Sequence, residues 1–267
     1  MNEHICGNLL IIGGAEDKSG ECKILKLFIK EAAEGEKICI ITAAAKEGRE
    51  SGEVYRNIFV NLGCKDVSVI NINDRTEANC DDLLGKLYNV KGIFFTGGDQ
   101  LRITSMLGGT LLGKKIQKLY EDGVIIAGTS AGASAMSDNM IIGGMTDTPG
   151  KKSIRMAPGL GLLKGVIIDQ HFAQRGRIGR VLTAVAMNPY VLGLGIDEDT
   201  AVLVEDKAII KVIGKGTVAI IDGISSSLSN VEELKDEQPL AFAPVQLHIL
   251  CEGYEYDIYT RKSRKQE

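Results

Sequence analysis

Short apolar runs alternate with amphipathic stretches along the first half of the chain. The run at Asn8–Ile12, for example, precedes a stretch, Cys22–Ala33, in which apolar residues recur with helical spacing. Such alternation is typical of βα units, whose strands pair in a parallel sheet and are buried on both faces by helices. The pattern therefore predicts an α/β fold, a three-layer sandwich around a mostly parallel central sheet.

The same alternation predicts the individual elements up to residue 127. The predicted strands are Asn8–Ile12, Lys37–Thr42, Asp66–Ile70, Gly92–Thr96 and Val124–Ala127. The predicted helices are Cys22–Ala33, Val54–Leu62, Asp81–Tyr88, Gln100–Leu107 and Leu112–Asp122.

The pattern changes in the second half, where a strand at Val166–Ile168, a helix at Arg177–Met187 and a strand at Val191–Ile196 come first. Short segments separated by polar or glycine turns follow, and they predict a small antiparallel meander at one edge. These segments are Ala201–Glu205, Ala208–Ile213 and Thr217–Ile221. The charged tail, Thr260–Glu267, is expected to fray.

No linker or repeat interrupts the 267 residues, so we expect one domain spanning residues 1–267. A net charge of −4 argues against nucleic acid or an anionic membrane as a bulk partner. Because the sequence has neither a basic leader nor an apolar run near the roughly 18 residues of a membrane span, we expect a cytoplasmic protein. Six scattered cysteines, without a CxxC pair or a Cys/His cluster, are typical of buried thiols, so no metal and no cofactor is expected.

A glycine-flanked serine follows the strand at Val124–Ala127. The segment Gly128-Thr129-Ser130-Ala131-Gly132 fits the pattern G-x-S-x-G, and the small residues after it can open a helix. Such an elbow projects the serine Oγ above the sheet, and its glycines let the backbone double back. Ser130 is therefore the candidate nucleophile, with the alternative that it only caps the helix.

A serine hydroxyl needs a base, and the sequence contains three histidines. His4 lies ahead of the first strand, and His248 lies in an alternating strand where it faces solvent or packs. His171 follows the strand at Val166–Ile168, and ligands gather at the carboxyl ends of parallel strands. We expect His171 to be the base.

Three neighbouring acids, Asp197, Glu198 and Asp199, follow the strand at Val191–Ile196. Any one of them can orient the histidine, and residue chemistry alone does not separate them. The chain order of serine, histidine and acid differs from that of the α/β-hydrolases. The site therefore belongs to another scaffold or to a convergent one.

A second glycine turn, Gly97-Gly98, ends the strand at Gly92–Thr96. The backbone N–H groups of Gly98 and of Ala131, the residue after the serine, can form an oxyanion hole. The alternative is a plain Gly-Gly turn.

Three arginines, Arg175, Arg177 and Arg180, follow His171 closely. Guanidinium groups suit bidentate recognition of carboxylate or phosphate, and cations at a helix N-terminus oppose the helix dipole. We therefore expect the arginines to bind an anionic group of the substrate, with a solvated helix start as the alternative.

Acids in the same region complement these cations. Asp169, Asp197 and Asp199 can hold a cationic group on the same ligand. The sequence thus favours a zwitterionic peptide as the substrate over an ester or a lipid.

Together these residues resemble the cyanophycinases, serine exopeptidases related to aspartyl dipeptidase (peptidase E). The matching segments are Leu10–Lys18, Phe95–Gln100, Gly128–Ala133, Asp169–Phe172 with the three arginines, and Gly195–Ala201. Roughly the last forty residues carry no motif of the family.

The resemblance implies a flavodoxin-like fold akin to the class I glutamine amidotransferases, and a homodimer. It implies a catalytic triad of Ser130, His171 and Glu198. The residues that it places in the substrate pocket are Gln100, Asp169, Gln170, Arg175, Arg177 and Arg180. The implied substrate is cyanophycin, a poly-aspartate with arginine on each β-carboxyl, released as β-Asp-Arg dipeptides.

Two other functions fit the same residues. One is an aspartyl dipeptidase, which would cleave short Asp-containing peptides but not the polymer. The other is a non-catalytic protein that holds an anionic ligand with its arginines, in which Ser130 would not react with an acylating probe.

Overall fold

Parallel strands lie side by side in the order β1-β5-β4-β2-β3 at the centre of the largest sheet. The computed structural model of the chain describes residues 6–44, 48–144, 149, 154–206, 208–234 and 238–266. The strands are β1 (Leu9–Ile12), β2 (Ile38–Ile41), β3 (Val67–Ile70), β4 (Gly92–Phe95) and β5 (Ile125–Thr129). The strands predicted for the first half of the chain are thus present and parallel.

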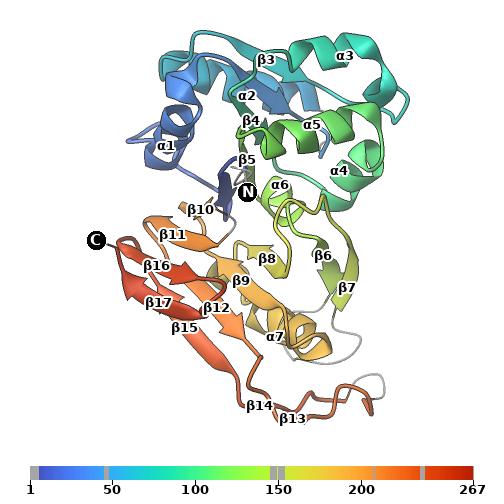
Figure 1. Cartoon of the computed structure of the whole chain (residues 1–267), viewed down its shortest axis with the longest axis vertical. Helices are drawn as coiled ribbons and strands as arrows, with labels where there is room; N and C mark the ends of the chain where they lie inside the picture. Colours follow the sequence, from blue (N-terminus) through green and yellow to red (C-terminus); the bar gives the residue numbers. More distant parts are fainter. Residues whose placement is uncertain are drawn as a thin grey trace, which may run out of the picture.

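Helices cover both faces of these strands (Figure 1). The described helices are α1 (Lys23–Glu31), α2 (Gly48–Asn61), α3 (Asp81–Lys86), α4 (Gln100–Leu107), α5 (Leu111–Glu121), α6 (Ala131–Ser134) and α7 (Ile178–Met187), with 3₁₀ turns η1 (Ala33–Gly35), η2 (Glu77–Asn79) and η4 (Ala173–Arg175). On one face, Phe28 of α1 and Phe59 of α2 pack on Phe94 of β4. On the other, Ile103 of α4 and Ile116 of α5 join a second apolar cluster. Because strand side chains alternate between the faces, each strand supplies both clusters.

Helix α2 begins at Gly48, ahead of Val54–Leu62, the stretch that was predicted to lie in a helix. A Cβ on Gly52 would lie 2.7 Å from Cγ1 of Val69, so the glycine lets this helix approach β3 closely. The early part of the helix is polar and contains glycine, and it therefore lacks the apolar period from which a helix is predicted.

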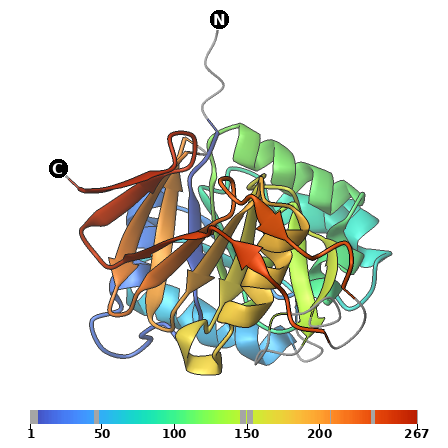
Figure 2. The same cartoon turned by 90° about the horizontal axis from the view of Figure 1, so that it is seen from below.

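The large sheet continues on the other side of β1 with antiparallel strands. Within the described residues it has nine strands, in the order β17-β16-β11-β10-β1-β5-β4-β2-β3. The added strands are β10 (Thr200–Glu205), β11 (Ile209–Gly214), β16 (Tyr254–Asp257) and β17 (Lys262–Lys265). These carboxyl-terminal strands, orange to red, lie below the parallel half in Figure 1 and face the viewer in Figure 2.

The charged tail forms a strand, so the prediction that residues 260–267 fray is wrong for the described residues up to 266. Strand β17 pairs antiparallel with β16 along its whole length. Arg264 lies 2.5 Å from the carboxylate of Glu255 on β16, and β16 is anchored by the fully buried Tyr256. Charged side chains are common on edge strands, where they discourage pairing with another molecule.

A second sheet of four described strands lies beside the first, in the order β15-β12-β9-β8. Its strands are β8 (Val166–Gln170), β9 (Leu192–Ile196), β12 (Val218–Asp222) and β15 (Gln246–Leu250). Two hairpins complete the described strands, β6 (Asn139–Gly144) with β7 (Ile154–Pro158) and β13 (Leu228–Ser229) with β14 (Phe242–Ala243).

The predicted meander is therefore only partly correct. Strands β10 and β11 form an antiparallel pair in the large sheet, but β12 pairs with β9 and β15 in the second sheet. The redirection occurs at Gly214, which has φ +113°, and at Thr217, whose N–H and hydroxyl both donate to Asp197. A turn that leads the chain into another sheet has the same residue types as a hairpin turn, so sequence alone did not distinguish them.

The arrangement of the sheets brings several strand ends together. Ile12 of β1 is the register partner of Thr129 of β5, and Gln170 of β8 is that of Ile196 of β9. The loops after these strands consequently start at neighbouring points. The fold is a mixed α/β fold, and no helix among the described residues is both long and apolar enough to cross a membrane.

Candidate active site

Ser130 occupies the sharp turn between β5 and α6. Its backbone has φ 53° and ψ −113°, a conformation that is strained for a residue with a side chain. A Cβ on Gly128 would lie 2.6 Å from the backbone of Gly132, and a Cβ on Gly132 would lie 2.6 Å from the carbonyl oxygen of Phe95. Both flanking glycines are therefore required by close backbone approach, as the elbow motif demands.

His171 lies against this serine. Its Nε2 atom is 3.1 Å from the Oγ atom of Ser130. The backbone N–H of His171 donates to the carbonyl of Gly13 at 2.8 Å, and a Cβ on Gly14 would lie 2.6 Å from Nε2. The turn after β1 thus fixes both the backbone and the ring of the histidine.

Glu198 completes a hydrogen-bonded series that begins at the serine. Its Oε1 atom lies 2.6 Å from Nδ1 of His171. The backbone N–H of Glu198 donates to the side-chain oxygen of Gln174 at 3.2 Å, which ties the acid loop to the turn after His171. A carboxylate at Nδ1 keeps the proton on that nitrogen and leaves Nε2 free to accept one from Ser130.

The two neighbouring acids have structural partners instead. Asp197 is buried and accepts hydrogen bonds from the backbone N–H of Ala173 at 3.0 Å and from the hydroxyl of Thr217 at 2.8 Å. Asp199 accepts a hydrogen bond from the backbone N–H of Asp17 at 2.8 Å and pairs with Lys215 at 2.7 Å. Both carboxylates thus have partners within the protein, and their contact with a cationic group of the substrate stays a prediction.

Burial lowers the pKa of His171 below its usual 6.5, and the charges of Arg175 and Arg177 lower it further. The hydrogen bond to Glu198 opposes this effect without outweighing it. The imidazole is therefore neutral at neutral pH and able to accept a proton.

A glycine turn after β4 faces the serine. A Cβ on Gly97 would lie 3.4 Å from Cβ of Ser130. Gly98 has φ +143°, and a Cβ there would lie 2.7 Å from the carbonyl carbon of Ala44. Within the described part of the chain, the backbone N–H groups of Gly98 and Ala131 donate to no protein acceptor, so both are available to an oxyanion.

Asp169, Arg177 and Arg180 form a buried ionic cluster beneath His171. Nε of Arg180 donates to Oδ2 of Asp169 at 2.5 Å, Nη2 of Arg180 donates to Oδ1, and Nη1 of Arg177 lies 3.3 Å from Oδ1. Arg177 also donates to the carbonyl of Gln170. Asp169 is therefore engaged by these two arginines, and the alternative of a solvated helix start does not hold for Arg177 and Arg180, which are buried.

The remaining pocket residues from the sequence differ in their availability. Arg175 is exposed in η4, and no carboxylate among the described residues pairs with it. The side-chain oxygen of Gln170 is 3.4 Å from Oγ of Ser130. The amide of Gln100 donates to the carbonyl of Ile141 at 2.7 Å, which ties α4 to β6.

His248 has partners away from the serine. Nδ1 of His248 lies 3.2 Å from the hydroxyl of Ser263, and its ring packs edge-on against Tyr256 with centroids 5.1 Å apart. His4 lies outside the described residues.

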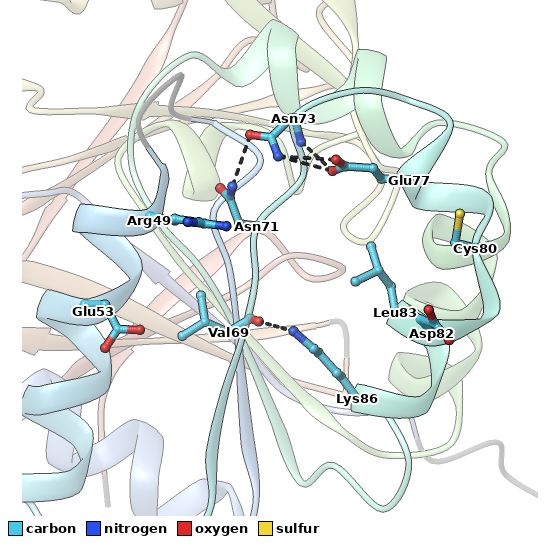
Figure 3. Close-up of a pocket in the computed structure, with 10 residues that line it drawn as sticks. All are labelled: Arg49, Glu53, Val69, Asn71, Asn73, Glu77, Cys80, Asp82, Leu83 and Lys86. Carbon is cyan, nitrogen blue, oxygen red and sulfur yellow. Dashed lines mark hydrogen bonds between the residues drawn. The ribbon is translucent and has the colours of Figure 1, made fainter.

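Two cavities, of about 630 and 700 Å³, open beside β3 and are not lined by Ser130. Figure 3 shows the first, where Asn73 contacts Asn71 and Glu77, and Lys86 donates to the carbonyl of Val69. These polar groups satisfy one another, and none of them reaches the reacting groups. The strand ends, and not these two cavities, therefore mark the candidate active site.

Glu16 is a candidate site residue that the sequence pattern did not indicate. It follows the Gly13-Gly14 turn and is 3% exposed, with its Oε2 atom 2.6 Å from the hydroxyl of Thr129, the residue before the nucleophile. The available signals were its place in the loop after β1 and in the segment Leu10–Lys18, which matches the family.

Known proteins resemble the chain in both sequence and fold. A model of peptidase family S51 matches residues 9–212. A cyanophycinase from Geminocystis herdmanii is 40% identical over 268 residues, covering 99% of this chain and 97% of the relative. A cyanophycinase from Trichormus variabilis is 39% identical over 256 residues, covering 95% and 86%.

Among solved structures, a peptidase from an acI-B1 Actinobacterium has a TM-score of 0.68 at 20% identity and covers 98% of both chains, which is a likeness of fold. The family model spans most of the chain, and the relatives match nearly all of it. The chain therefore belongs to peptidase family S51 and is a serine-type peptidase.

Proposed function

We propose that this peptidase is a cyanophycinase, which hydrolyses cyanophycin to β-Asp-Arg dipeptides through an acyl-enzyme on Ser130. The observation that carries the proposal is the series from Ser130 Oγ to His171 Nε2 at 3.1 Å and from His171 Nδ1 to Glu198 at 2.6 Å, beside a cluster of arginines. The relatives named cyanophycinase, at 36–40% identity over 95–99% of the chain, support the same substrate.

The first half of the reaction forms the acyl-enzyme. Nε2 of His171 takes the Ser130 proton while Oγ attacks a backbone carbonyl carbon of the poly-aspartate. The carbonyl oxygen becomes an oxyanion and accepts hydrogen bonds from the N–H groups of Gly98 and Ala131. Glu198 stabilises the imidazolium that forms.

The second half releases the products. His171 gives its proton to the leaving backbone nitrogen, and the C–N bond breaks to free an amine. A water molecule then loses its proton to His171 and attacks the acyl carbon. Collapse of this second intermediate returns the proton to Ser130 and frees a carboxylate.

The arginines give the site its preference for a charged substrate. One carboxylate, Asp169, faces two buried guanidinium groups, so Arg177 and Arg180 leave an excess positive charge under the site. Burial lowers the pKa of Arg177 to about 10, so this side chain is still a cation at neutral pH. The exposed Arg175 adds a third guanidinium. This field favours the arginyl carboxylates of the polymer, and Gln100 and Gln170 are the further residues of the proposed pocket.

The parallel half supports a flavodoxin-like assignment, which we also propose. Reading β3-β2-β4-β5 in space gives the order 2-1-3-4 of that fold, and β1 takes the fifth position.

A homodimer is proposed as well, because Leu247 and Ile249 of the edge strand β15 are exposed apolar residues. Sedimentation equilibrium of the purified protein, which gives its mass in solution, tests this proposal. The single domain and the cytoplasmic location stay predictions.

The substrate is tested by incubating the purified enzyme with cyanophycin and identifying the products by mass spectrometry. We expect β-Asp-Arg to accumulate with the unmodified enzyme and not with Ser130→Ala. Cleavage of short Asp-containing dipeptides with the polymer left intact would instead make the enzyme an aspartyl dipeptidase. No cleavage of either, and no labelling of Ser130 by a phosphonofluoridate, would contradict the proposed chemistry.

A further inference from the structure

One short loop, Gly13–Asp17, contacts the elements that carry all three reacting groups; we call it the β1 loop. The carbonyl of Gly13 accepts the backbone N–H of His171 at 2.8 Å, and the carbonyl of Gly14 accepts that of Asp199 at 2.9 Å. Immediately before the loop, the carbonyl of Ile12 accepts the backbone N–H of Ser130 at 3.1 Å. The nucleophile, the base and the acid loop are therefore all hydrogen-bonded to three consecutive residues, Ile12, Gly13 and Gly14.

Glu16 makes the side-chain connection from this loop to the elbow. Its side chain is fully buried, and its two carboxylate oxygens accept hydrogen bonds from different elements. Oε2 accepts from the hydroxyl of Thr129 at 2.6 Å, and Oε1 accepts from the hydroxyl of Tyr55 on α2. Burial of a carboxylate lowers the stability of the fold unless the group is paired and hydrogen-bonded, and these two hydrogen bonds offset that cost for Glu16.

A cation and a phenol lie against the Glu16 carboxylate. Nζ of Lys18 lies 3.6 Å from Oε1 and supplies a counter-charge, with its ammonium 5.0 Å from the centroid of the Tyr55 ring. Burial raises the pKa of Tyr55 and the charge of Glu16 raises it further, so the phenol remains a donor. Neither Ser130 nor His171 touches the Glu16 carboxylate, which therefore acts only through its neighbours.

We propose that Glu16 is a positioning residue for the nucleophile: by clamping Thr129 to the β1 loop, it sets the place of Ser130 relative to His171. The inference rests on the proposed role of Ser130. His171 is held by Gly13 and Gly14, and Ser130 follows Thr129 directly. The Glu16–Thr129 hydrogen bond therefore connects the loop that holds the base to the residue beside the nucleophile. A misplacement of about 1 Å at reacting atoms can lower a rate about a hundredfold.

The test is a pair of substitutions at Thr129, which is buried. Thr129→Val keeps the shape and removes the hydroxyl, whereas Thr129→Ser keeps the hydroxyl. We expect Thr129→Val to lower kcat by about ten- to a hundredfold with KM unchanged, and Thr129→Ser to restore most of it. Glu16→Gln should lower kcat in the same way, since an amide cannot accept both hydroxyl protons.

Thr42→Val is the matched control, because Thr42 is also a buried threonine after a strand end and bonds to Asn71 at 2.8 Å away from the reacting groups. It should leave kcat within about twofold. Equal losses of kcat in Thr129→Val and Thr42→Val, or no loss in Thr129→Val, would overturn the inference. The rate of Ser130 labelling by a phosphonofluoridate should fall in parallel with kcat. Labelling that persists in Ser130→Ala would defeat the proposed function itself, whereas labelling lost in Ser130→Ala but normal in Thr129→Val defeats only the role of Glu16.

Discussion

Oε1 of Glu198 lies 2.6 Å from Nδ1 of His171 across a separation of 27 residues in the sequence. The two side chains differ in exposure, 38% for the glutamate and 11% for the histidine. The carboxylate is thus at the rim of the site while the ring is inside. It orients the imidazole without being buried itself.

Glu198→Gln is expected to lower kcat by about 10²–10⁴-fold, because an amide neither enforces the tautomer nor stabilises the imidazolium. Steady-state kinetics on cyanophycin measure the change. Glu205→Gln is the control, since Glu205 pairs with Lys211 at the surface and should leave kcat unchanged. Comparable kcat in the two variants would remove Glu198 from the triad.

The pH dependence follows from the direction of the His171 shift. Burial holds the pKa of His171 below 6.5, so kcat/KM should rise through an apparent pKa below 6.5 and then level off. Arg175→Gln removes a charge that lowers this pKa, and the acid limb should therefore move to higher pH. Profiles from about pH 4 to about pH 8 measure the limb. Arg56→Gln, a distant surface change, should leave it in place, and an unmoved or lowered limb in Arg175→Gln would contradict the assignment.

Removing the charge of Asp169 should destabilise the fold. Asp169→Asn leaves the buried guanidinium groups of Arg177 and Arg180 without a counter-charge, which costs about 3–5 kcal/mol in the free energy of unfolding. Arg175→Gln, at an exposed position, should change it by no more than about 0.5 kcal/mol. Urea unfolding followed by circular dichroism suits a chain without tryptophan. A stable Asp169→Asn variant would mean that the cluster is not held by this carboxylate.

Gly14→Ala should lower kcat by about a hundredfold, because the new methyl would lie 2.6 Å from Nε2 of His171 and displace the ring. Gly63→Ala is closely matched in backbone geometry, with φ +99° against φ +97°, but has no atom within 4 Å of the added Cβ. In both variants an alanine must adopt a strained positive φ, but only in Gly14→Ala does the added methyl group clash with the imidazole of His171. If both lost activity equally, the contact with His171 would not be the cause.

Much of the parallel half was predictable because four of its strands, β1, β2, β4 and β5, are buried at every position and begin as apolar runs. The strands that pair with β12 were not predictable, because they depend on which sheet the chain enters after Thr217 and not on the residues of β12 itself. The polar strand β17 was missed because its side chains all face solvent, which in sequence is indistinguishable from a frayed tail.

The residues of the candidate site also differ in how far the sequence predicts them. Ser130 was indicated by a local motif and His171 by its place after a strand, whereas only the resemblance to the family separated Glu198 from Asp197 and Asp199. The engagement of Asp169 by Arg177 and Arg180 depends on how α7 is oriented over β8, which no local pattern reports. The role of Glu16 was harder still to predict, because its hydrogen-bond partners Thr129 and Tyr55 come from distant parts of the chain.

The candidate active site is shared between two sheets. Ser130 follows a strand of the nine-stranded sheet, whereas His171 follows a strand of the four-stranded one. The backbone hydrogen bond from His171 to Gly13 joins the two sheets beside these residues, so any loss of the packing between the sheets is expected to separate the hydroxyl from the imidazole. On heating, hydrolytic activity should therefore disappear no later than the secondary structure of either sheet.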